Sequence, residues 1–397
     1  MSRILFTWEL GRGLGHLLPH RRTVEALRER GDEVFFASRN LQAMEKVFGG
    51  LGVRYLQAPF KCSPPTHPIE KTVTFAHILN NVGFDHPGEL FSLVAAWRNL
   101  FELIKPDLVI CDHSPTALLA LRGLPAKRAT IGAGFSCPIA VAPFPILEPR
   151  LPHSPEELLA DETRLLSNAN EVLDRFGSPP LEYLAQLYAD LDDRILITFQ
   201  EMDHYQDRAG ATYWGLSPLV AGAPPAWPPG DRRRVFGYLK PFASLPTLLE
   251  LLNKLELPTV IHPDGISTSI QQKYASRTLH FQQERVDIAQ ARRDCHFAIL
   301  NANHATMAAF VLGGKPVLNF PLSLEQEMCA APIVERGAGL VVSGTEPNDI
   351  FRKMEMILGS DEYTAGAERI AEKYRDWDYE ASGIHLAEHM ESLIART

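Results

Sequence analysis

The sequence predicts an α/β protein of two domains, each built on a doubly wound parallel sheet. First, the chain has 397 residues, which is more than one hydrophobic core usually holds. Second, strand-like and helix-like segments alternate in both halves, as they do in parallel sheets covered by helices. Third, a proline-rich segment lies between the halves. The composition, with 45% hydrophobic and 22% charged residues, is that of a globular protein with a large core.

The first half opens with a strand, a helix and a second strand. Residues 3–8 form a β-rich apolar run, and a glycine cluster follows them. Apolar residues then recur at helical spacing from Leu17 to Leu27, and residues 33–37 form a second apolar run. The two runs are separated by the length of a parallel crossover. Further buried strands are predicted in this half at residues 106–112 and 194–199.

The second half repeats the alternation after a linker. Residues 212–234 contain the run Pro-Pro-Ala-Trp-Pro-Pro-Gly, which continues neither a helix nor a central strand. Strand-like and helix-like segments then alternate at residues 235–239, 245–255, 258–262, 296–300, 305–312 and 316–320. Residues 384–394 predict a closing helix that crosses back onto the first domain. The predicted boundaries are an N-terminal domain at 1–215, a linker at 216–234, a C-terminal domain at 235–380 and a C-terminal helix at 381–397.

Charge and cysteine usage exclude several classes of partner. The net charge of -9 provides no broad positive field for nucleic acid or for an anionic membrane surface. The five cysteines form no CxxC pair, so reduced structural thiols are expected. No signal-peptide pattern and no apolar stretch of membrane-spanning length is visible. We therefore expect a cytoplasmic protein without a transmembrane segment or a nucleic-acid partner.

The first candidate site is the run Gly-Arg-Gly-Leu-Gly-His at residues 11–16, between a strand and a helix. Gly13 and Gly15 permit a tight turn and the close approach of a ligand phosphate or sugar to a helix N-terminus. As a dinucleotide fingerprint the run fails at its last position, where His16 replaces glycine, which weakens the hypothesis of an NAD-dependent oxidoreductase. A glycine-rich turn with an incidental histidine remains the alternative. The charge cluster at residues 20–22 is interpreted as a solvated face.

The second candidate is Asp112, which ends the strand predicted at residues 106–112. Ligands of open α/β sheets bind at the carboxyl ends of the strands, and loops that leave two strands of one sheet can bring His16 and Asp112 together. A carboxylate behind an imidazole fixes its tautomer and stabilises its protonated form, so the pair would act as a general base. The alternative is a carboxylate that caps the next helix.

The third candidate is the loop at residues 301–306. A strand delivers this polar, small-residue loop to a helix start, where backbone N–H groups and the helix dipole can hold a diphosphate. The residues considered for ligand binding are Asn301, Asn303, His304, Ala305 and Thr306, together with Glu325 and Gln326 farther along the chain. An ordinary loop with a helix cap is the alternative.

The order of these motifs resembles the GT-B glycosyltransferases that use nucleotide sugars, especially the UDP-glycosyltransferase superfamily and its antibiotic-glycosylating bacterial members. In that family a Gly-His followed by a proline opens the first helix, as Gly15-His16 and Pro19 do here. The family's second domain carries an HGGxGT loop, a glycine-proline pair and an Asp-Gln pair. Residues 301–306, 314–316 and 325–326 stand at those places in this chain. The resemblance implies two Rossmann-like domains facing a central cleft, with His16 as the acceptor base and Asp112 as its partner.

The same resemblance implies a metal-independent, inverting glycosyltransferase of natural-product biosynthesis. It would move a sugar from a dTDP- or UDP-linked donor to a hydroxyl of a small or lipid-like acceptor, with no cofactor besides the donor. The first domain would bind the acceptor and the second the nucleotide sugar, which the pair at 325–326 would contact. Loops at 61–85 and 135–151 are rich in Phe, Pro and Ile and favour a partly apolar acceptor. The Asp-x-Asp triplets at 190–192 and 376–378 are interpreted as surface carboxylates.

Two departures from the family pattern concern the donor. Asn301 stands where the family has a phosphate-binding histidine, and Ala309 stands where UDP-using members often place a ribose-binding glutamate. A neutral hydrogen bond is weaker than a charged one, so Asn301 weakens phosphate binding, and His304 is the candidate that compensates. A missing glutamate matters less for a deoxyribose donor, which favours dTDP. The alternatives are a non-catalytic or auxiliary nucleotide-sugar-binding protein and a nucleotide-sugar epimerase or hydrolase of the same fold.

Overall fold

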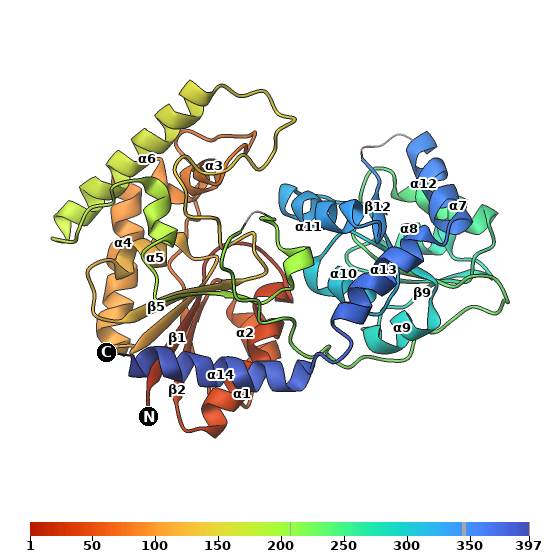
Figure 1. The fold of residues 1–397 in the computed structure, drawn as a ribbon, viewed down its shortest axis with the longest axis horizontal. Coiled ribbons are helices and arrows are strands. Elements are labelled where there is room, and N and C mark those ends of the chain that lie inside the picture. Colours follow the sequence, from red (N-terminus) through yellow and green to blue (C-terminus); the bar gives the residue numbers. More distant parts are fainter. Residues whose placement is uncertain (207, 344–346, 397) are drawn as a thin grey trace. The chain divides into compact units, whose positions relative to one another are not determined.

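The computed structural model describes residues 1–206, 208–343 and 347–396, which form two compact units (Figure 1). Unit 1 comprises Met1–Phe199, Asp207–Pro218 and Asp378–Thr397, and unit 2 comprises Gln200–Gln206 and Leu219–Trp377. Each unit contains one six-stranded sheet with flanking helices. Unit 1 is discontinuous in sequence, because the chain passes through unit 2 before it supplies the last helix of unit 1.

Unit 1 is built on a parallel sheet with the strand order β3-β2-β1-β4-β5-β6. Its strands are β1 (Arg3–Trp8), β2 (Glu33–Ser38), β3 (Arg54–Gln57), β4 (Leu108–Asp112), β5 (Lys127–Gly132) and β6 (Asp193–Leu196). All five residues of β4 and the last five of β1 are buried, as expected for central strands covered on both faces. The order is that of a doubly wound nucleotide-binding sheet, in which β1 and β4 are neighbours.

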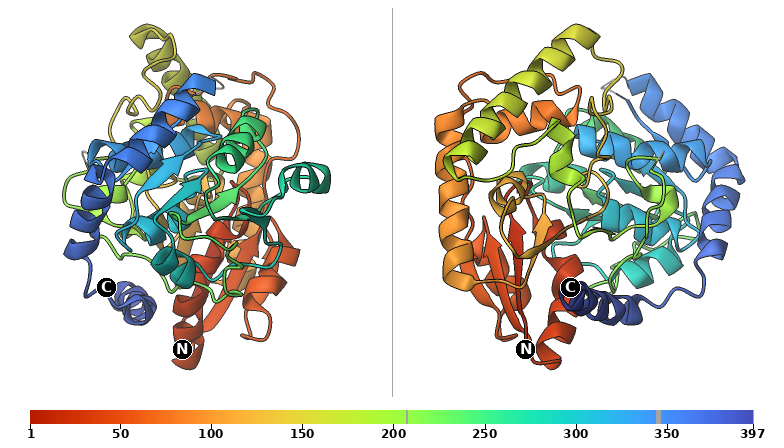
Figure 2. Two further views of the ribbon diagram at one scale, coloured as in Figure 1. Left: turned by 90° about the vertical axis from the view of Figure 1, so that its right-hand side faces the viewer. Right: turned by 60° about the vertical axis from the view of Figure 1, so that its left-hand side comes forward.

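In unit 1, helix α1 packs against α14, and α4 packs against both α5 and α6 (Figures 1 and 2). They are α1 (Arg21–Glu29), α2 (Leu41–Phe48), α3 (Phe75–Leu79), α4 (Pro87–Ile104), α5 (Pro115–Leu121), α6 (Pro155–Arg175) and α14 (Tyr379–Ala395). Short turns of 3-10 helix occur at Leu14–His16, Leu18–His20 and Leu184–Tyr188, and a π-helical turn at Asn80–Phe84. Helix α14 places Leu386, Met390 and Leu393 in the same core as Val24 and Leu27 of α1.

Unit 2 repeats this plan with the strand order β12-β11-β10-β7-β8-β9, again all parallel. Its strands are β7 (Val235–Leu239), β8 (Thr259–Pro263), β9 (Leu279–Phe281), β10 (Phe297–Leu300), β11 (Val317–Asn319) and β12 (Gly339–Val341). Its helices are α7 (Leu245–Lys254), α8 (Thr268–Tyr274), α9 (Ile288–Asp294), α10 (His304–Val311), α11 (Leu324–Glu335), α12 (Pro347–Gly359), α13 (Glu362–Lys373) and the 3-10 turn Gln200–Met202. The first strand of the unit, β7, therefore lies beside the fourth, β10.

The predicted fold class is confirmed, since both sheets are parallel and doubly wound. The prediction of a helix directly after the glycine cluster is wrong. Two 3-10 turns occupy residues 14–20, and the α-helix begins only at Arg21. Gly13 has a φ of 87°, and Pro19 lies within the second 3-10 turn.

The strand predicted at residues 194–199 is shorter than expected. Strand β6 ends at Leu196, although Ile197 still donates its backbone N–H to Gly132 O at 2.9 Å. The residues beyond it are mostly buried but leave the sheet to reach the 3-10 turn at residues 200–202. Burial explains why the apolar pattern continues past the end of the strand.

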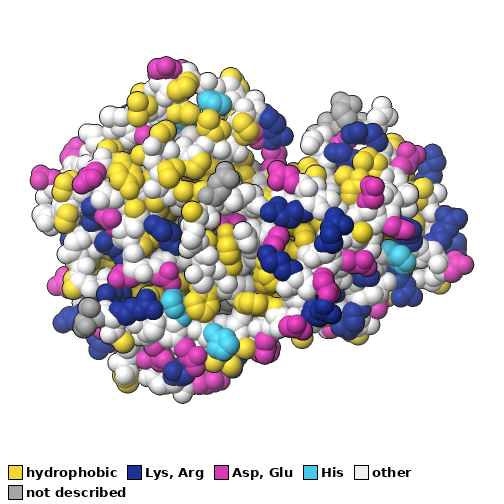
Figure 3. All heavy atoms as spheres, viewed as in Figure 1, with side chains coloured by type: hydrophobic (Ala, Val, Ile, Leu, Met, Phe, Trp, Pro, Cys, Tyr) yellow, Lys and Arg dark blue, Asp and Glu magenta, His cyan; other side chains and the backbone are white. Residues whose placement is uncertain are grey.

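The surface carries charges of both signs. Lys and Arg side chains alternate with Asp and Glu side chains over the face drawn in Figure 3. Within the described ranges, no helix combines the length and apolar character that a membrane crossing requires.

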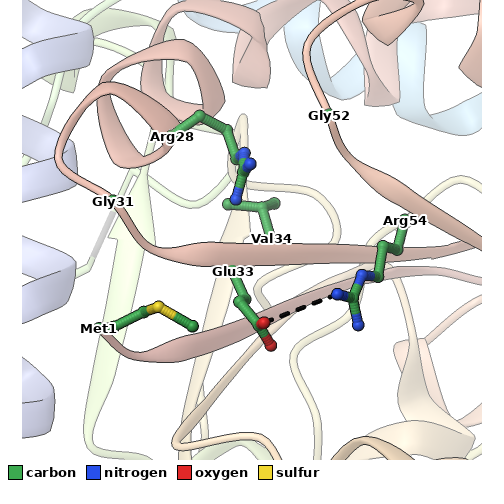
Figure 4. Close-up of a pocket in the computed structure, with 7 residues that line it drawn as sticks. All are labelled: Met1, Arg28, Gly31, Glu33, Val34, Gly52 and Arg54. Carbon is green, nitrogen blue, oxygen red and sulfur yellow. Dashed lines mark ion pairs between the residues drawn. The ribbon is translucent and has the colours of Figure 1, made fainter.

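Figure 4 shows a pocket lined by Met1, Arg28, Gly31, Glu33, Val34, Gly52 and Arg54. Glu33 and Arg54 begin β2 and β3 and form an ion pair at 3.6 Å, so this pocket lies at the amino ends of the strands, away from the predicted ligand edge.

Candidate functional site

The structure brings His16 and Asp112 together at the carboxyl edge of the first sheet. Strands β1 and β4 are parallel neighbours with Trp8 opposite Asp112, so the loop after β1 and the end of β4 meet there. Leu10 donates its backbone N–H to His113 O at 3.1 Å, which joins the two loops. His16 Nδ1 lies 3.0 Å from Asp112 Oδ1. A carboxylate only accepts, so His16 carries its proton on Nδ1, and in the neutral ring the lone pair is on Nε2.

A second histidine occupies the other oxygen of the same carboxylate. His20 Nε2 lies 3.1 Å from Asp112 Oδ2, and the His20 side chain is 1% exposed. The prediction that the cluster at residues 20–22 is a solvated face is therefore wrong for His20. His20 lies three residues after Leu17 and four before Val24, which are both buried, so it falls on the apolar side of this segment.

Burial and neighbouring imidazoles determine the charges at this site. Burial alone would raise the pKa of the Asp112 carboxyl, but His16 and His20 hold that pKa below its usual range. Burial lowers the pKa of His113 to about 3, and His16 adds to this effect, so His113 is neutral at pH 7. The indole of Trp8 stacks on the His16 ring with centroids 5.2 Å apart. Asp112 is therefore the anion of this cluster, and 19% of the His16 side chain is exposed.

The glycine that matters most at the site is Gly11. A Cβ at Gly11 would lie 2.3 Å from His16 Nε2, and the φ of Gly11 is +88°. Gly13 has a positive φ but open space around it, and Gly15 has open space and needs no unusual φ. The sequence motif favoured Gly13 and Gly15, but the close approach that requires glycine is that of Gly11 to His16.

In unit 2, the Asn301 side chain is buried and forms hydrogen bonds with backbone groups of the protein. Its Oδ1 accepts from the backbone N–H of Lys240 at 2.7 Å, and its Nδ2 donates to Phe320 O at 2.8 Å. The side chain is 0% exposed. Asn301 thereby joins the ends of three adjacent strands, β7, β10 and β11. Both ends of the amide are used internally, so the expected contact of Asn301 with a phosphate does not fit its placement.

The remaining predicted residues lie near the start of α10 and α11. Asn303 Oδ1 accepts from Gln326 Nε2 at 2.9 Å, and Gln326 Oε1 accepts from Leu322 N at 2.7 Å. Gln326 therefore fixes the loop before α10 against the start of α11. Glu325 and Ala305 are exposed, and Thr306 is half-buried in the first turn of α10. These last residues are the ones that a ligand at this edge of the sheet can reach.

His304 does not supply the positive charge of the phosphate-binding histidine that Asn301 replaces. Burial lowers the pKa of His304 to about 3, and the nearby His204 lowers it further. The two rings stack with centroids 6.1 Å apart. His304 is therefore neutral at pH 7 and contributes hydrogen-bonding capacity only. Ala309 is 1% exposed, and Ala302 has a positive φ of 57° at a position where the family has glycine.

Three aspartates of the Asp-x-Asp triplets hydrogen-bond to the protein. Asp190 Oδ2 accepts from Arg122 Nη1 at 2.7 Å, and Asp192 Oδ2 accepts from the backbone N–H of Arg128 at 2.9 Å. Asp378 Oδ1 accepts from the N–H groups of Glu380 and Ala381, which caps α14. These contacts give Asp190, Asp192 and Asp378 structural roles within unit 1.

Sequence reasoning missed four residues of the site in unit 1. His20 and Gly11 were part of the motifs that drew attention to this region, but their contacts with Asp112 and His16 were not predicted. Trp8 was interpreted only as a strand residue. Glu9 follows β1 and is fully buried, with Oε2 accepting from Thr116 N at 3.1 Å. A charged residue directly after an apolar strand was the available signal for Glu9.

Comparisons with known proteins give the fold. No protein-family model and no curated protein sequence matches the chain. Among solved structures it is similar to the calicheamicin glycosyltransferase CalG4, with a TM-score of 0.72 and 16% identity over 100% of this chain and 99% of that chain. It is also similar to the glycosyltransferase VinC in complex with dTDP, with a TM-score of 0.69 and 16% identity over 100% of both chains. The Streptomyces sp. SF2575 glycosyltransferase SsfS6, complexed with thymidine diphosphate, gives a TM-score of 0.62 and 18% identity over 98% of this chain and 100% of that chain. The chain thus has the GT-B fold of two Rossmann-like domains.

Proposed function

We propose that this protein is a glycosyltransferase that moves a sugar from a nucleoside diphosphate to an acceptor hydroxyl. The observation that carries the proposal is the contact of His16 with Asp112 at the carboxyl edge of the first sheet, with Nδ1 3.0 Å from Oδ1. This contact makes Nε2 of His16 the basic nitrogen of the ring, beside the glycine loop. The fold supports the proposal, since the similar structures named above are glycosyltransferases.

The donor we propose is a dTDP-sugar bound by unit 2. Two of the similar structures hold thymidine diphosphate, and the loop at residues 301–306 leads into α10 at the carboxyl edge of the second sheet. Backbone N–H groups and the dipole at the start of α10 suit a diphosphate, and the Thr306 hydroxyl adds a donor. Glu325, exposed at the start of α11, is the side chain we assign to the sugar.

The reaction we propose is a single displacement without a metal ion. His16 Nε2 takes the proton of the acceptor hydroxyl while that oxygen forms a bond to the anomeric carbon. The bond from this carbon to the diphosphate oxygen breaks, and the diphosphate leaves with the electron pair. Because the acceptor attacks the face opposite the leaving group, the configuration inverts. Asp112 stabilises the imidazolium of His16, and the start of α10 stabilises the diphosphate.

The experiment that tests the proposal compares the parent protein with His16→Ala. We incubate dTDP- and UDP-sugars with a panel of hydroxyl acceptors and measure glycosylated product by mass spectrometry. The His16→Ala variant is expected to lose at least about 100-fold in turnover, the usual contribution of a general base, while dTDP binding by calorimetry stays within about twofold. Full activity of His16→Ala would contradict the mechanism.

The other outcomes separate the alternatives. Nucleotide binding without product for any acceptor would favour a non-catalytic or auxiliary binding protein. Consumption of the donor without an acceptor, giving free nucleotide or an isomeric sugar, would favour a hydrolase or an epimerase. Added EDTA is expected to leave turnover unchanged, and a loss that Mg²⁺ or Mn²⁺ restores would contradict transfer without a metal.

A further inference from the structure

Asp112 is held by two histidines, and the mechanism above uses only one of them. His20 Nε2 lies 3.1 Å from Asp112 Oδ2, the oxygen that His16 does not contact, and His20 is 0% exposed. We propose that His20 is a positioning residue that orients Asp112 and tunes the basicity of His16. The proposal deepens the function proposed above and rests on it for its kinetic part.

The hydrogen-bond pattern indicates the tautomer of His20. Within the described ranges, His20 Nδ1 is buried and has no hydrogen-bond partner. A proton on Nδ1 would therefore be a buried donor without an acceptor, whereas a proton on Nε2 points at the carboxylate. His20 thus donates Nε2–H to Asp112 Oδ2, and His16 donates Nδ1–H to Oδ1. Each carboxylate oxygen accepts from one imidazole.

Packing keeps the His20 ring in this place. The ring centroid lies 5.7 Å from that of Phe6 on β1 and 6.4 Å from that of Phe36 on β2. The preceding residue is held as well, because Ser217 Oγ donates to Pro19 O. A side chain packed against two strands of the sheet has little freedom, so it can hold Asp112 in one orientation.

Two consequences follow for His16. First, the carboxylate cannot rotate away from His16 without leaving the Nε2–H of His20 unpaired in the interior. Second, the hydrogen bond from His20 partly neutralises the negative charge of the Asp112 carboxylate. Without His20 the full charge would act on His16 and stabilise its protonated form, so the pKa of His16 would rise. His20 therefore favours the neutral form of His16, which is the form that accepts a proton.

If His20 had only a structural role, its variants would change the stability of the protein but not the pKa of His16. Filling the same space with Leu would then change stability but not the titration of His16. A Gln side chain can place its Nε2 near the position of the imidazole Nε2 and keep the donor, whereas Asn is one methylene shorter. Thr23 in α1 is 1% exposed, and within the described part of the chain its hydroxyl has no hydrogen-bond partner, so Thr23→Val is the matched packing control.

The test measures the titration of the His16 imidazole by ¹⁵N NMR in the full-length parent, His20→Leu, His20→Gln, His20→Asn and Thr23→Val. His113 interacts with both His16 and Asp112, so its signal is assigned separately with His113→Gln. We expect the pKa of His16 to rise by about half a unit or more in His20→Leu and His20→Asn, and to stay at the parent value in His20→Gln and Thr23→Val. This readout needs no substrate, so it stands even if the transfer reaction is not found.

The kinetic part uses the same variants with the donor and acceptor that the parent turns over. His20→Leu is expected to lose on the order of tenfold in kcat while KM stays within about twofold, and the acid limb of its pH profile should move to higher pH. His20→Gln should recover most of the loss. An unshifted His16 titration in both His20→Leu and His20→Asn would overturn the proposal. If His20→Leu fails to give a cooperative melting transition, the His20→Gln and His20→Asn pair decides, since these two differ in reach and not in polarity.

Discussion

Gly11 has no side chain, and this leaves room for Nε2 of His16, the nitrogen that we propose to accept the proton. The space that a Cβ would occupy is 2.3 Å from His16 Nε2, the nitrogen that carries the lone pair. The other ring nitrogen, Nδ1, is already fixed by Asp112. A side chain at position 11 would therefore collide with the nitrogen at which an acceptor hydroxyl is to be deprotonated.

Replacing Gly11 by Ala is expected to displace His16 and to strain the backbone, because Gly11 has a φ of +88°. We predict that turnover falls at least about 100-fold, on the order of the loss in His16→Ala, and that the melting temperature falls as well. Gly15→Ala is the control, since a Cβ there meets nothing within 4 Å and the φ of Gly15 is not positive. Equal activity of the two variants would show that Gly11 does not set the position of His16.

The contact between His16 and Asp112 could be predicted from the sequence because both residues follow strands that parallel pairing brings side by side. The role of Asn301 could not be predicted from the sequence. Its position in the family motif indicated a phosphate, but its environment is set by Lys240 N and Phe320 O, which lie far away in the sequence. Burial of a polar side chain depends on such distant partners, and a local pattern does not contain them.

At the scale of elements, β1 and α5 are linked by the buried Glu9. Its Oε2 accepts from Thr116 N at the start of α5, which suits a carboxylate at a helix N-terminus. Burial nevertheless dominates and raises the pKa of Glu9 to about 8. The folded protein therefore holds a proton on Glu9 at a pH where the unfolded chain has released it.

This difference gives a pH dependence with a definite sign. Between the unfolded value of 4.5 and the folded value of about 8, the folded state binds one more proton, so stability falls as the pH rises. The slope is at most about 1.4 kcal/mol for each pH unit. We predict that Glu9→Gln removes this contribution. The measurement is urea unfolding by tryptophan fluorescence between pH 5 and pH 8.

The parent and Glu9→Gln must be compared at each pH, because His113 acts in the opposite direction. Its pKa falls from 6.5 to about 3 on folding, so it adds stability as the pH rises from about 3 through 6.5 in both proteins. The difference between the two proteins isolates Glu9. A difference that stays constant from pH 5 to pH 8 would mean that Glu9 is ionised in the folded state.

Hydrophobic periodicity predicted the strands β1, β2, β4, β6, β7, β8, β10 and β11 and the helices α1, α7, α10 and α14, whereas the other elements were not predicted. The turns between β1 and α1 could not be predicted, because 3-10 and α-helical turns share nearly the same apolar spacing. Pro19 was present in the sequence, yet a proline is equally compatible with the first turn of an α-helix. The burial of His20 could have been predicted, because it lies three residues after Leu17 and four before Val24 on the apolar side of the segment.

On the scale of the whole molecule, the two units have separate cores, so a ligand of one unit stabilises that unit first. If Ala309 reflects a donor without a ribose 2′-hydroxyl, dTDP should raise the melting temperature at least as much as UDP, and both more than GDP or NAD. The measurement is differential scanning calorimetry at equal nucleotide concentration. A clear preference for UDP would contradict the dTDP assignment and leave the proposed transfer in place.

Two variants show which unit binds the nucleotide that raises the melting temperature. Thr306→Ala removes a hydroxyl from the first turn of α10 and should reduce the shift, whereas His16→Ala in unit 1 should leave it unchanged. A shift that is lost in His16→Ala but kept in Thr306→Ala would place the nucleotide on unit 1 instead. The absence of any shift with all four nucleotides would leave the proposal resting on the fold alone.

Helix α14 has a consequence for biosynthesis on the ribosome. It contributes Leu386, Ala387, Met390 and Leu393 to the core of unit 1, and Arg30, which follows α1, pairs with Glu391 at 2.7 Å. The ribosome must translate all of residues 219–377 before these side chains exist. The apolar face of α1 therefore stays uncovered while residues 219–377 of unit 2 are synthesised. A nascent chain released before residue 378 would keep that face exposed to chaperones and proteases.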